Sequence, residues 1–150
     1  MYTLPVVFAM LFLKGDALGV SRYSPDRVSH VGWVSGACIL AQKKTFVDAN
    51  LFDEGIFLYM EEIDLFYRAR CEVLIFPEAK FIHTGAASSG SKKTPVINIY
   101  RGLVYFYRKH RSIIEQAILL AMLRAKARLA IALGSKTIKT TYEQALDALG

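Results

Sequence analysis

Two long helical patterns near the C-terminus limit the folds open to this chain. Residues 94–110 and 112–134 carry apolar side chains at the spacing of packed helices. Gly134 is suited to end the second pattern. A fold with such long terminal helices must bury an apolar face of each against the rest of the domain or against a partner.

The second helix also bears on a membrane location. Its uncharged run, residues 116–123, is too short to cross a bilayer before Arg124, Lys126 and Arg128 interrupt it. At 100° per residue, the two arginines share a side and the lysine falls nearly opposite. We therefore expect a helix that is not transmembrane and that lies at a lipid interface or packs on a partner domain.

The remainder of the chain mixes strand and helix patterns. Residues 36–42, 71–77 and 79–85 are predicted as short strands, whereas residues 43–50 and 61–70 are predicted as helices. The class is therefore α/β or α+β. Cys38 and Cys71 lie in apolar runs without metal-binding spacing, so both are expected to be buried free thiols.

The apolar N-terminal run, residues 4–13, has several interpretations. No Lys or Arg precedes it and no good cleavage site follows, which argues against a signal peptide. The run is too short for a transmembrane helix. A buried segment or an interfacial anchor is expected instead.

Charge is unevenly distributed. The formal net charge is +6, and residues 92–150 hold 11 Lys/Arg against 3 Asp/Glu. A basic C-terminal region suggests an anionic partner such as lipid headgroups. Nucleic acid is disfavoured because an amphipathic helix explains the alternation of basic and aromatic residues and no nucleic-acid motif accompanies it.

A cluster of carboxylates is the main candidate for chemistry. Glu61, Glu62 and Asp64 follow the apolar stretch 57–60. Acidic residues in a first helical turn also interact well with the helix dipole, so the pattern alone fits a surface helix. Partial desolvation by the apolar neighbours would instead raise a carboxylate pKa toward that of a usable base. His83, after a predicted strand, is the accompanying candidate ligand.

The order of motifs resembles a known family. The segments "WVSGACILAQKKTFVDANLFDEGIFLYMEEIDLFYRARCEVLIFPEAKFIHTGAASS", residues 33–89, and "YRGLVYFYRKHR", residues 100–111, resemble the C-terminal half of family 2 glycosyltransferases of the rhamnosyltransferase-like kind. The resemblance implies an α/β chain with a partial GT-A fold. It divides the chain into an N-terminal segment (1–32), an acceptor-side part of the catalytic domain (33–93) and a basic helical region (94–150).

The resemblance also implies residue roles. Glu62 falls at the general base that deprotonates the acceptor hydroxyl, Glu61 precedes it, and Asp64 matches a supporting aspartate. His83 matches a histidine that completes the coordination of Mg²⁺ or Mn²⁺ on the nucleotide diphosphate. The acceptor-side positions are Trp33, Ser35, Gly36 and Tyr59.

This sequence departs from the family pattern at several positions. Glu62 replaces the commoner aspartate, and Asn50 stands where a glycine often occurs. The nucleotide-binding half with its Asp-x-Asp metal motif is absent from these residues, so a divalent metal is expected only with that half. A separate N-terminal half is thus a possible partner.

Two functions remain open from the sequence. One is an inverting transferase of sugar from a nucleotide-sugar donor, such as dTDP-rhamnose or a UDP-hexose, to a lipid-linked or cell-envelope glycan acceptor, present as a fragment or split half. The other is a non-catalytic remnant that binds a membrane or a partner. For either, the expected location is cytoplasmic, peripheral on the cytoplasmic face of the membrane.

Overall fold

The computed structural model describes residues 2–13, 25–83 and 93–149. The helices are α1 (Leu4–Phe12), α2 (Lys43–Asp48), α3 (Glu61–Ala69), α4 (Lys93–His110), α5 (Ile113–Leu133) and α6 (Lys136–Asp147). The strands are β1 (Ser29–Val31) and β2 (Val73–Ile75). They pair antiparallel, with Ser29 opposite Ile75 and Val31 opposite Val73.

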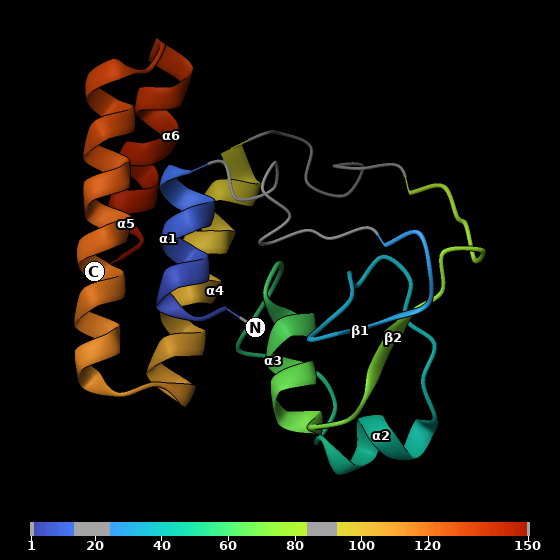
Figure 1. Cartoon of the computed structure of the whole chain (residues 1–150). Helices are drawn as coiled ribbons and strands as arrows, with labels where there is room; N and C mark the ends of the chain where they lie inside the picture. The colour runs from blue at the N-terminus through green and yellow to red at the C-terminus, as the bar shows by residue number, and fades with distance from the viewer. Residues whose placement is uncertain (1, 14–24, 84–92, 150) are drawn as a thin grey trace.

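The helices α1, α4, α5 and α6 pack side by side and form one half of the molecule, while the sheet and α2 lie on the other side of α3 (Figure 1). The buried core of the helical half centres on α4, whose Leu103, Phe106 and Tyr107 are almost completely inaccessible to solvent. Leu119 and Leu123 of α5 pack into the same cluster. Both α5 and α6 pack on α4, and α1 packs on α5.

The start of α5 follows from its sequence. Ser112 caps the helix because its hydroxyl accepts a hydrogen bond from the Glu115 N–H, and the Glu115 carboxylate accepts one from the Ser112 N–H. The N-terminal apolar run forms α1 beside α5, with Val7 and Ala9 buried. The expectation of a buried segment is thus met, although Phe8 is half exposed.

Two strand predictions were wrong. Residues 36–42 form no strand, and the side chain of Leu40 is almost wholly exposed. Residues 79–83 also form no strand, while the rest of that predicted segment lies outside the described residues. A strand requires a hydrogen-bonding neighbour, and in the described part of the chain β1 and β2 pair only with each other.

The prediction of buried thiols was also wrong, since Cys38 and Cys71 are both exposed. The predicted helices at 43–50 and 61–70 are confirmed as α2 and α3. Asn50, where the family pattern often has glycine, has a left-handed φ of 59° that asparagine tolerates better than most residues.

Candidate functional site

The carboxylates Glu61 and Glu62 begin α3 directly after a strained turn. Tyr59 and Met60 have φ values of 68° and 77°, in the left-handed region that side chains other than glycine avoid. Such conformations cost about 1–3 kcal/mol each and concentrate at functional sites. Met60 is nevertheless buried, at 3% exposure. Packing around the buried Met60 side chain therefore holds Tyr59 and Met60 in backbone conformations that are unfavourable for these residues.

Gly102 of α4 provides the space for this turn. A Cβ atom at Gly102 would lie 2.8 Å from Met60 Cγ and 3.0 Å from the backbone oxygen of Tyr59. Real Cβ contacts of 2.8 Å are essentially never seen. The glycine thus lets α4 approach the backbone that carries Glu61 and Glu62.

The carboxyl group of Glu62 has a raised pKa. Burial raises the pKa of its carboxyl above the usual glutamate value, and the charge of Glu61 raises it further. Backbone hydrogen bonds from Glu62 itself and from Gly36 partly oppose this rise. One carboxylate oxygen, Oε2, is buried without a hydrogen-bond partner in the structure.

Gly36 connects the predicted acceptor-side segment to Glu62. A Cβ atom at Gly36 would lie 3.9 Å from Glu62 Cβ, so the two residues are neighbours. Of the other predicted acceptor-side residues, Trp33 and Tyr59 are half-buried. Trp33 stacks at a tilt on Tyr2, with 5.8 Å between ring centroids. Ser35 is exposed, and its hydroxyl accepts a hydrogen bond of 3.3 Å from the Ala37 N–H.

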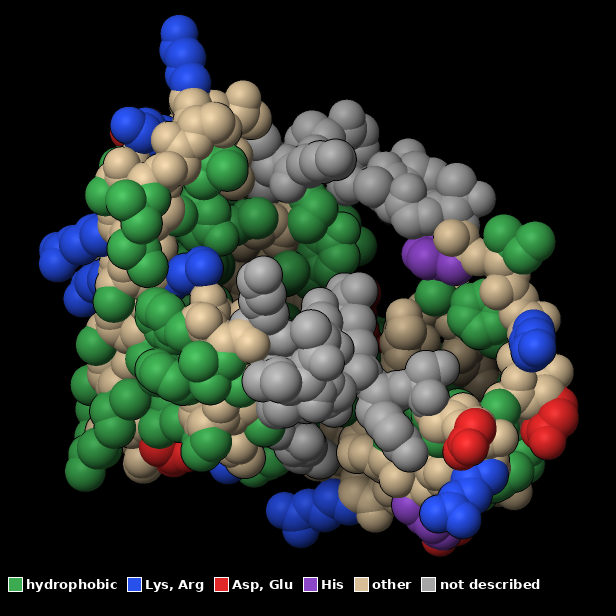
Figure 2. Space-filling model, turned by 45° about the horizontal axis from the view of Figure 1, so that its top comes forward, with side chains coloured by type: hydrophobic (Ala, Val, Ile, Leu, Met, Phe, Trp, Pro, Cys, Tyr) green, Lys and Arg blue, Asp and Glu red, His purple; other side chains and the backbone are tan. Residues whose placement is uncertain are grey.

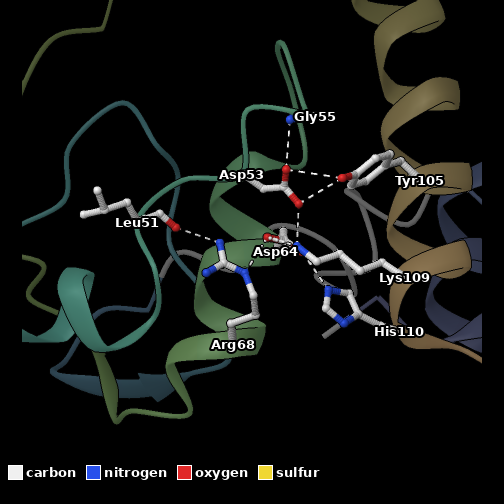
Figure 3. A network of polar contacts seen from close by, with 8 residues as sticks. All are labelled: Leu51, Asp53, Gly55, Asp64, Arg68, Tyr105, Lys109 and His110. Atoms are coloured by element: carbon white, nitrogen blue, oxygen red, sulfur yellow. Dashed lines mark hydrogen bonds and ion pairs between the residues drawn. The ribbon is translucent and has the colours of Figure 1, made fainter.

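Asp64 is a completely buried carboxylate held by three basic side chains (Figure 3). Its oxygens lie 2.7 Å from Arg68 Nε, 3.0 Å from Lys109 Nζ and 2.6 Å from His110 Nε2. Burial alone would raise the pKa of Asp64, but hydrogen bonds from His110, Arg68 and Lys109 outweigh it and lower the pKa. Asp64 therefore stays ionised and ties α3 to α4, while its oxygens face no solvent.

Asp53 extends this network to the loop before the strained turn. Lys109 donates to the Asp53 carboxylate at 2.5 Å, the Tyr105 hydroxyl donates at 3.1 Å, and the Gly55 N–H donates at 2.8 Å. The hydrogen bond from Lys109 is the main reason that the pKa of Asp53 falls to about 2. Lys109 thus joins two carboxylates from different segments.

His83, the predicted metal ligand, is exposed. Across residues 2–13, 25–83 and 93–149, no three His, Cys, Asp or Glu side chains gather in a way that could hold a metal ion. The structure brings Gly36 to Glu62 and Asp64 to the basic residues of α4. Among the described residues, no hydrogen bond or ion pair joins the side chain of Ser35 or His83 to the carboxylates.

Sequence reasoning missed the part played by α4. Tyr105, Lys109 and His110 lie within the matched segment 100–111 but received no role. The spacing of Tyr105 and Lys109, one helical turn apart, was the available signal for a shared partner. Nothing local identified that partner, because Asp53 lies 52 residues before Tyr105.

Comparison with known proteins relates this chain to glycosyltransferases over part of its length. The relatives found are the N-acetylglucosaminyl-diphospho-decaprenol L-rhamnosyltransferases of Mycobacterium tuberculosis strains CDC 1551 and H37Rv. Each is 32% identical to the chain over 84 residues, which is 54% of this chain and 27% of the relative. The match thus spans about a quarter of the relatives' length. No family model matches the chain, and no solved structure matches it significantly.

Proposed function

We propose that this chain is the acceptor-side part of an inverting family 2 glycosyltransferase with a GT-A fold. It would act on a nucleotide-sugar donor and a lipid-linked or cell-envelope glycan acceptor. The observation that carries the proposal is Glu62, a carboxylate of raised pKa with an unpartnered buried oxygen, presented by a strained turn. The relationship to the mycobacterial rhamnosyltransferases supports the reaction class.

In this reaction Glu62 takes the proton of the acceptor hydroxyl as its oxygen attacks the anomeric carbon. The bond between that carbon and the diphosphate oxygen breaks, and the nucleoside diphosphate leaves. Glu61 contributes by raising the pKa of Glu62. Asp64 is a positioning residue because its carboxylate is buried and already bound to three side chains. Trp33, Ser35, Gly36 and Tyr59 are assigned to the acceptor side.

The described residues do not form a metal site by themselves. A divalent cation, Mg²⁺ or Mn²⁺, remains part of the proposal for the donor diphosphate, and His83 is the residue of this chain assigned to it. The other ligands would come from an Asp-x-Asp segment, which this sequence does not contain. We propose that a nucleotide-binding half, in the same protein or as a separate partner, supplies them.

The test is reconstitution of transfer with a nucleotide-binding half supplied in trans or by fusion. Labelled sugar from dTDP-rhamnose or a UDP-hexose is followed into an N-acetylglucosaminyl-diphospho-polyprenol acceptor. Glu62→Gln should lower kcat by about 10²–10⁴-fold, the usual contribution of a general base. Glu78→Gln, at an exposed glutamate, is the matched control. Equal activity of the two variants would remove Glu62 from the mechanism.

A second candidate function, membrane association without catalysis, has its own supporting observation. The buried face of α5 contains Leu119, Leu123 and Ala127, yet the opposite face is also apolar and exposed. That exposed face, called the α5 stripe below, comprises Ile114, Ile118, Ala121, Ala125, Leu129 and Ala132. The exposed Arg124 and Arg128 flank it. Figure 2 shows apolar side chains over much of the helical half, with Lys and Arg at its margin.

Within the described residues no helix combines the length and apolarity needed to span a bilayer. The α5 stripe instead fits shallow insertion, with the arginines near anionic headgroups. We propose a peripheral position on the cytoplasmic face of the membrane; the α5 stripe and its arginines support contact with a membrane surface. Flotation with anionic vesicles should recover the chain, and Ile118→Ser with Leu129→Ser should abolish recovery. Full recovery of that double variant would contradict the assignment.

A further inference from the structure

Gly36 differs from three other glycines of the described residues because packing does not explain its missing side chain. A Cβ atom at Gly55, Gly102 or Gly134 would come within 2.8 Å or less of a neighbouring atom, so packing disfavours a side chain there. At Gly36 the described atoms within 4 Å of such a Cβ are Glu62 Cβ at 3.9 Å and Glu62 Cδ at 4.0 Å. These are ordinary van der Waals distances. Among the described residues, nothing in the packing therefore requires glycine at position 36.

The backbone of Gly36 does not require glycine either. Its φ angle lies outside the left-handed region, which is where glycine has its conformational advantage. The residue belongs to a short turn that Ser35 holds in place. The Ser35 carbonyl accepts a hydrogen bond of 3.4 Å from the Cys38 N–H, and the Ser35 hydroxyl accepts one of 3.3 Å from the Ala37 N–H. Alanine could occupy position 36 without strain in this turn.

The missing side chain instead leaves space beside the carboxyl group of Glu62. Gly36 is exposed, whereas Glu62 is half-buried. A Cβ at position 36 would lie 4.0 Å from the carboxyl carbon of Glu62, on a side that is now open to solvent. A hydroxyl group bound to a carboxylate places the two oxygens about 2.5–3.0 Å apart. Any side chain at position 36 would therefore compete with such a group for the same space.

The backbone N–H of Gly36 acts on the same carboxyl group. It donates a hydrogen bond to Glu62, which favours the charged form and partly opposes the rise in pKa caused by burial. Gly36 thus orients the carboxyl group through its N–H and leaves it accessible through the absence of a side chain.

The other carboxylates of α3 do not share this opening. Asp64 is completely buried and is bound by basic side chains of α3 and α4. The described atoms within 4 Å of a Cβ at Gly36 include none from Glu61 or Asp64. The space above Gly36 therefore belongs to Glu62.

We propose that Gly36 is a specificity-determining residue, whose missing side chain forms the opening through which an acceptor hydroxyl group reaches Glu62. A hydroxyl group on a ring carbon brings two neighbouring carbons with it, so the space of a single methyl group matters. The role of the opening in transfer rests on the proposed function, whereas the opening itself does not.

The opening is tested on the full chain alone, without donor or metal. A water-soluble carbodiimide with glycine ethyl ester converts accessible carboxyl groups into amides, and mass spectrometry gives the rate at each glutamate. We expect the labelling rate of Glu62 to fall severalfold in Gly36→Ala and further in Gly36→Val. The exposed Glu78 is the internal standard and should keep its rate. Ala37→Ser, which adds one heavy atom to the next residue of the turn, is the matched control and should leave the Glu62 rate unchanged.

Stability and kinetics separate this role from a structural one. Gly36→Ala should leave the midpoint of urea unfolding unchanged or raise it, because alanine fits the backbone and restricts the unfolded chain. In the reconstituted transferase, Gly36→Ala should raise the KM for the acceptor and leave the KM for the nucleotide-sugar donor unchanged. Ala37→Ser should change neither KM.

Several outcomes would overturn the proposal. Labelling of Glu62 that is as fast in Gly36→Ala and Gly36→Val as in the unchanged chain would show that the carboxyl group is reached from another side. A lower urea midpoint in Gly36→Ala would show that folding requires the glycine. Slower labelling with an unchanged acceptor KM would refute the role in specificity. If labelling slows as expected but Glu62→Gln leaves transfer intact, the opening stands and the proposed catalytic base does not.

Discussion

Replacement of Asp64 by asparagine tests whether the buried network connects α3 to α4. Asp64→Asn keeps the shape of the side chain and removes its charge. Asp64 is 0% exposed, and its oxygens lie within 3.0 Å of Arg68, Lys109 and His110. Removal of one member of a buried ion pair typically costs 3–5 kcal/mol, because the remaining charge loses its partner. We therefore expect the variant to have a lower free energy of unfolding than the unchanged chain.

The contacts that remain in Asp64→Asn indicate a loss of stability near the lower end of that range. Lys109 keeps Asp53 as a partner, and Arg68 keeps a 2.8 Å hydrogen bond to the Leu51 carbonyl. We therefore expect Asp64→Asn to lower the free energy of unfolding by about 3 kcal/mol. Asp53→Asn is the matched control, since it removes the other carboxylate on Lys109. Because the Asp53 side chain is 19% exposed, we expect Asp53→Asn to lower the free energy of unfolding by only about 1–2 kcal/mol.

Urea unfolding followed by circular dichroism measures both variants and the double variant. The m-value should stay constant, so that changes in midpoint report stability. The double variant leaves Lys109 without a carboxylate partner, and its loss should exceed the sum of the single losses. A loss for Asp64→Asn no larger than that for Asp53→Asn would refute the assignment of Asp64 as the anchor of α3.

Three further predictions follow from the same geometry. Burial raises the pKa of Glu62. The acid limb of the pH profile of kcat/KM for the reconstituted transferase should therefore have an apparent pKa above the ordinary glutamate value of about 4.3. An apparent pKa at or below that value would contradict the proposed base. Gly102→Ala should destabilise the fold by about 1–3 kcal/mol through its clash with Met60, although alanine favours an exposed helix by about 1 kcal/mol; a more stable variant in thermal unfolding would show that the turn yields freely. The folded-state pKa of Asp53 is lowered to about 2, so its carboxylate stabilises the fold above the ordinary aspartate pKa of about 3.9 and loses this effect as the pH falls toward 2. Acid titration of Asp53→Asn should show a shallower loss of stability over this pH range, and an unchanged slope would count against the role of Asp53.

Helices were predicted better than strands for a physical reason. The helix α3 is encoded locally, because Ile63 and Phe66 repeat at the spacing of one buried face and the acidic residues suit its first turn. The apolar run 36–42 satisfied the compositional pattern of a buried strand equally well. A strand also needs a neighbouring strand, and in the described part of the chain none pairs with this run, whose Leu40 is almost fully exposed.

The candidate site was predictable in part for a similar reason. The motif around Glu62 is continuous in the sequence, so the carboxylates could be identified from residues 57–70. The partners that orient them come from α4, 46 residues beyond Asp64 in the case of His110. No periodicity in the sequence links residues so far apart. Gly102 was missed as well, because its importance depends on the backbone of Tyr59 and Met60 rather than on its own neighbours.

The position of Glu62 therefore depends on contacts between α3 and α4. Tyr59 and Met60 adopt left-handed conformations, which together cost about 2–6 kcal/mol in isolation. Only interactions from outside the turn can offset this cost, and the structure shows two: the burial of Met60 against Gly102 and the binding of Asp64 by α4. We expect loss of either to let the turn relax toward ordinary backbone angles. A variant that leaves Glu62 intact but weakens the contact between α3 and α4 should therefore reduce transfer, because the proposed base would no longer be held beside Gly36.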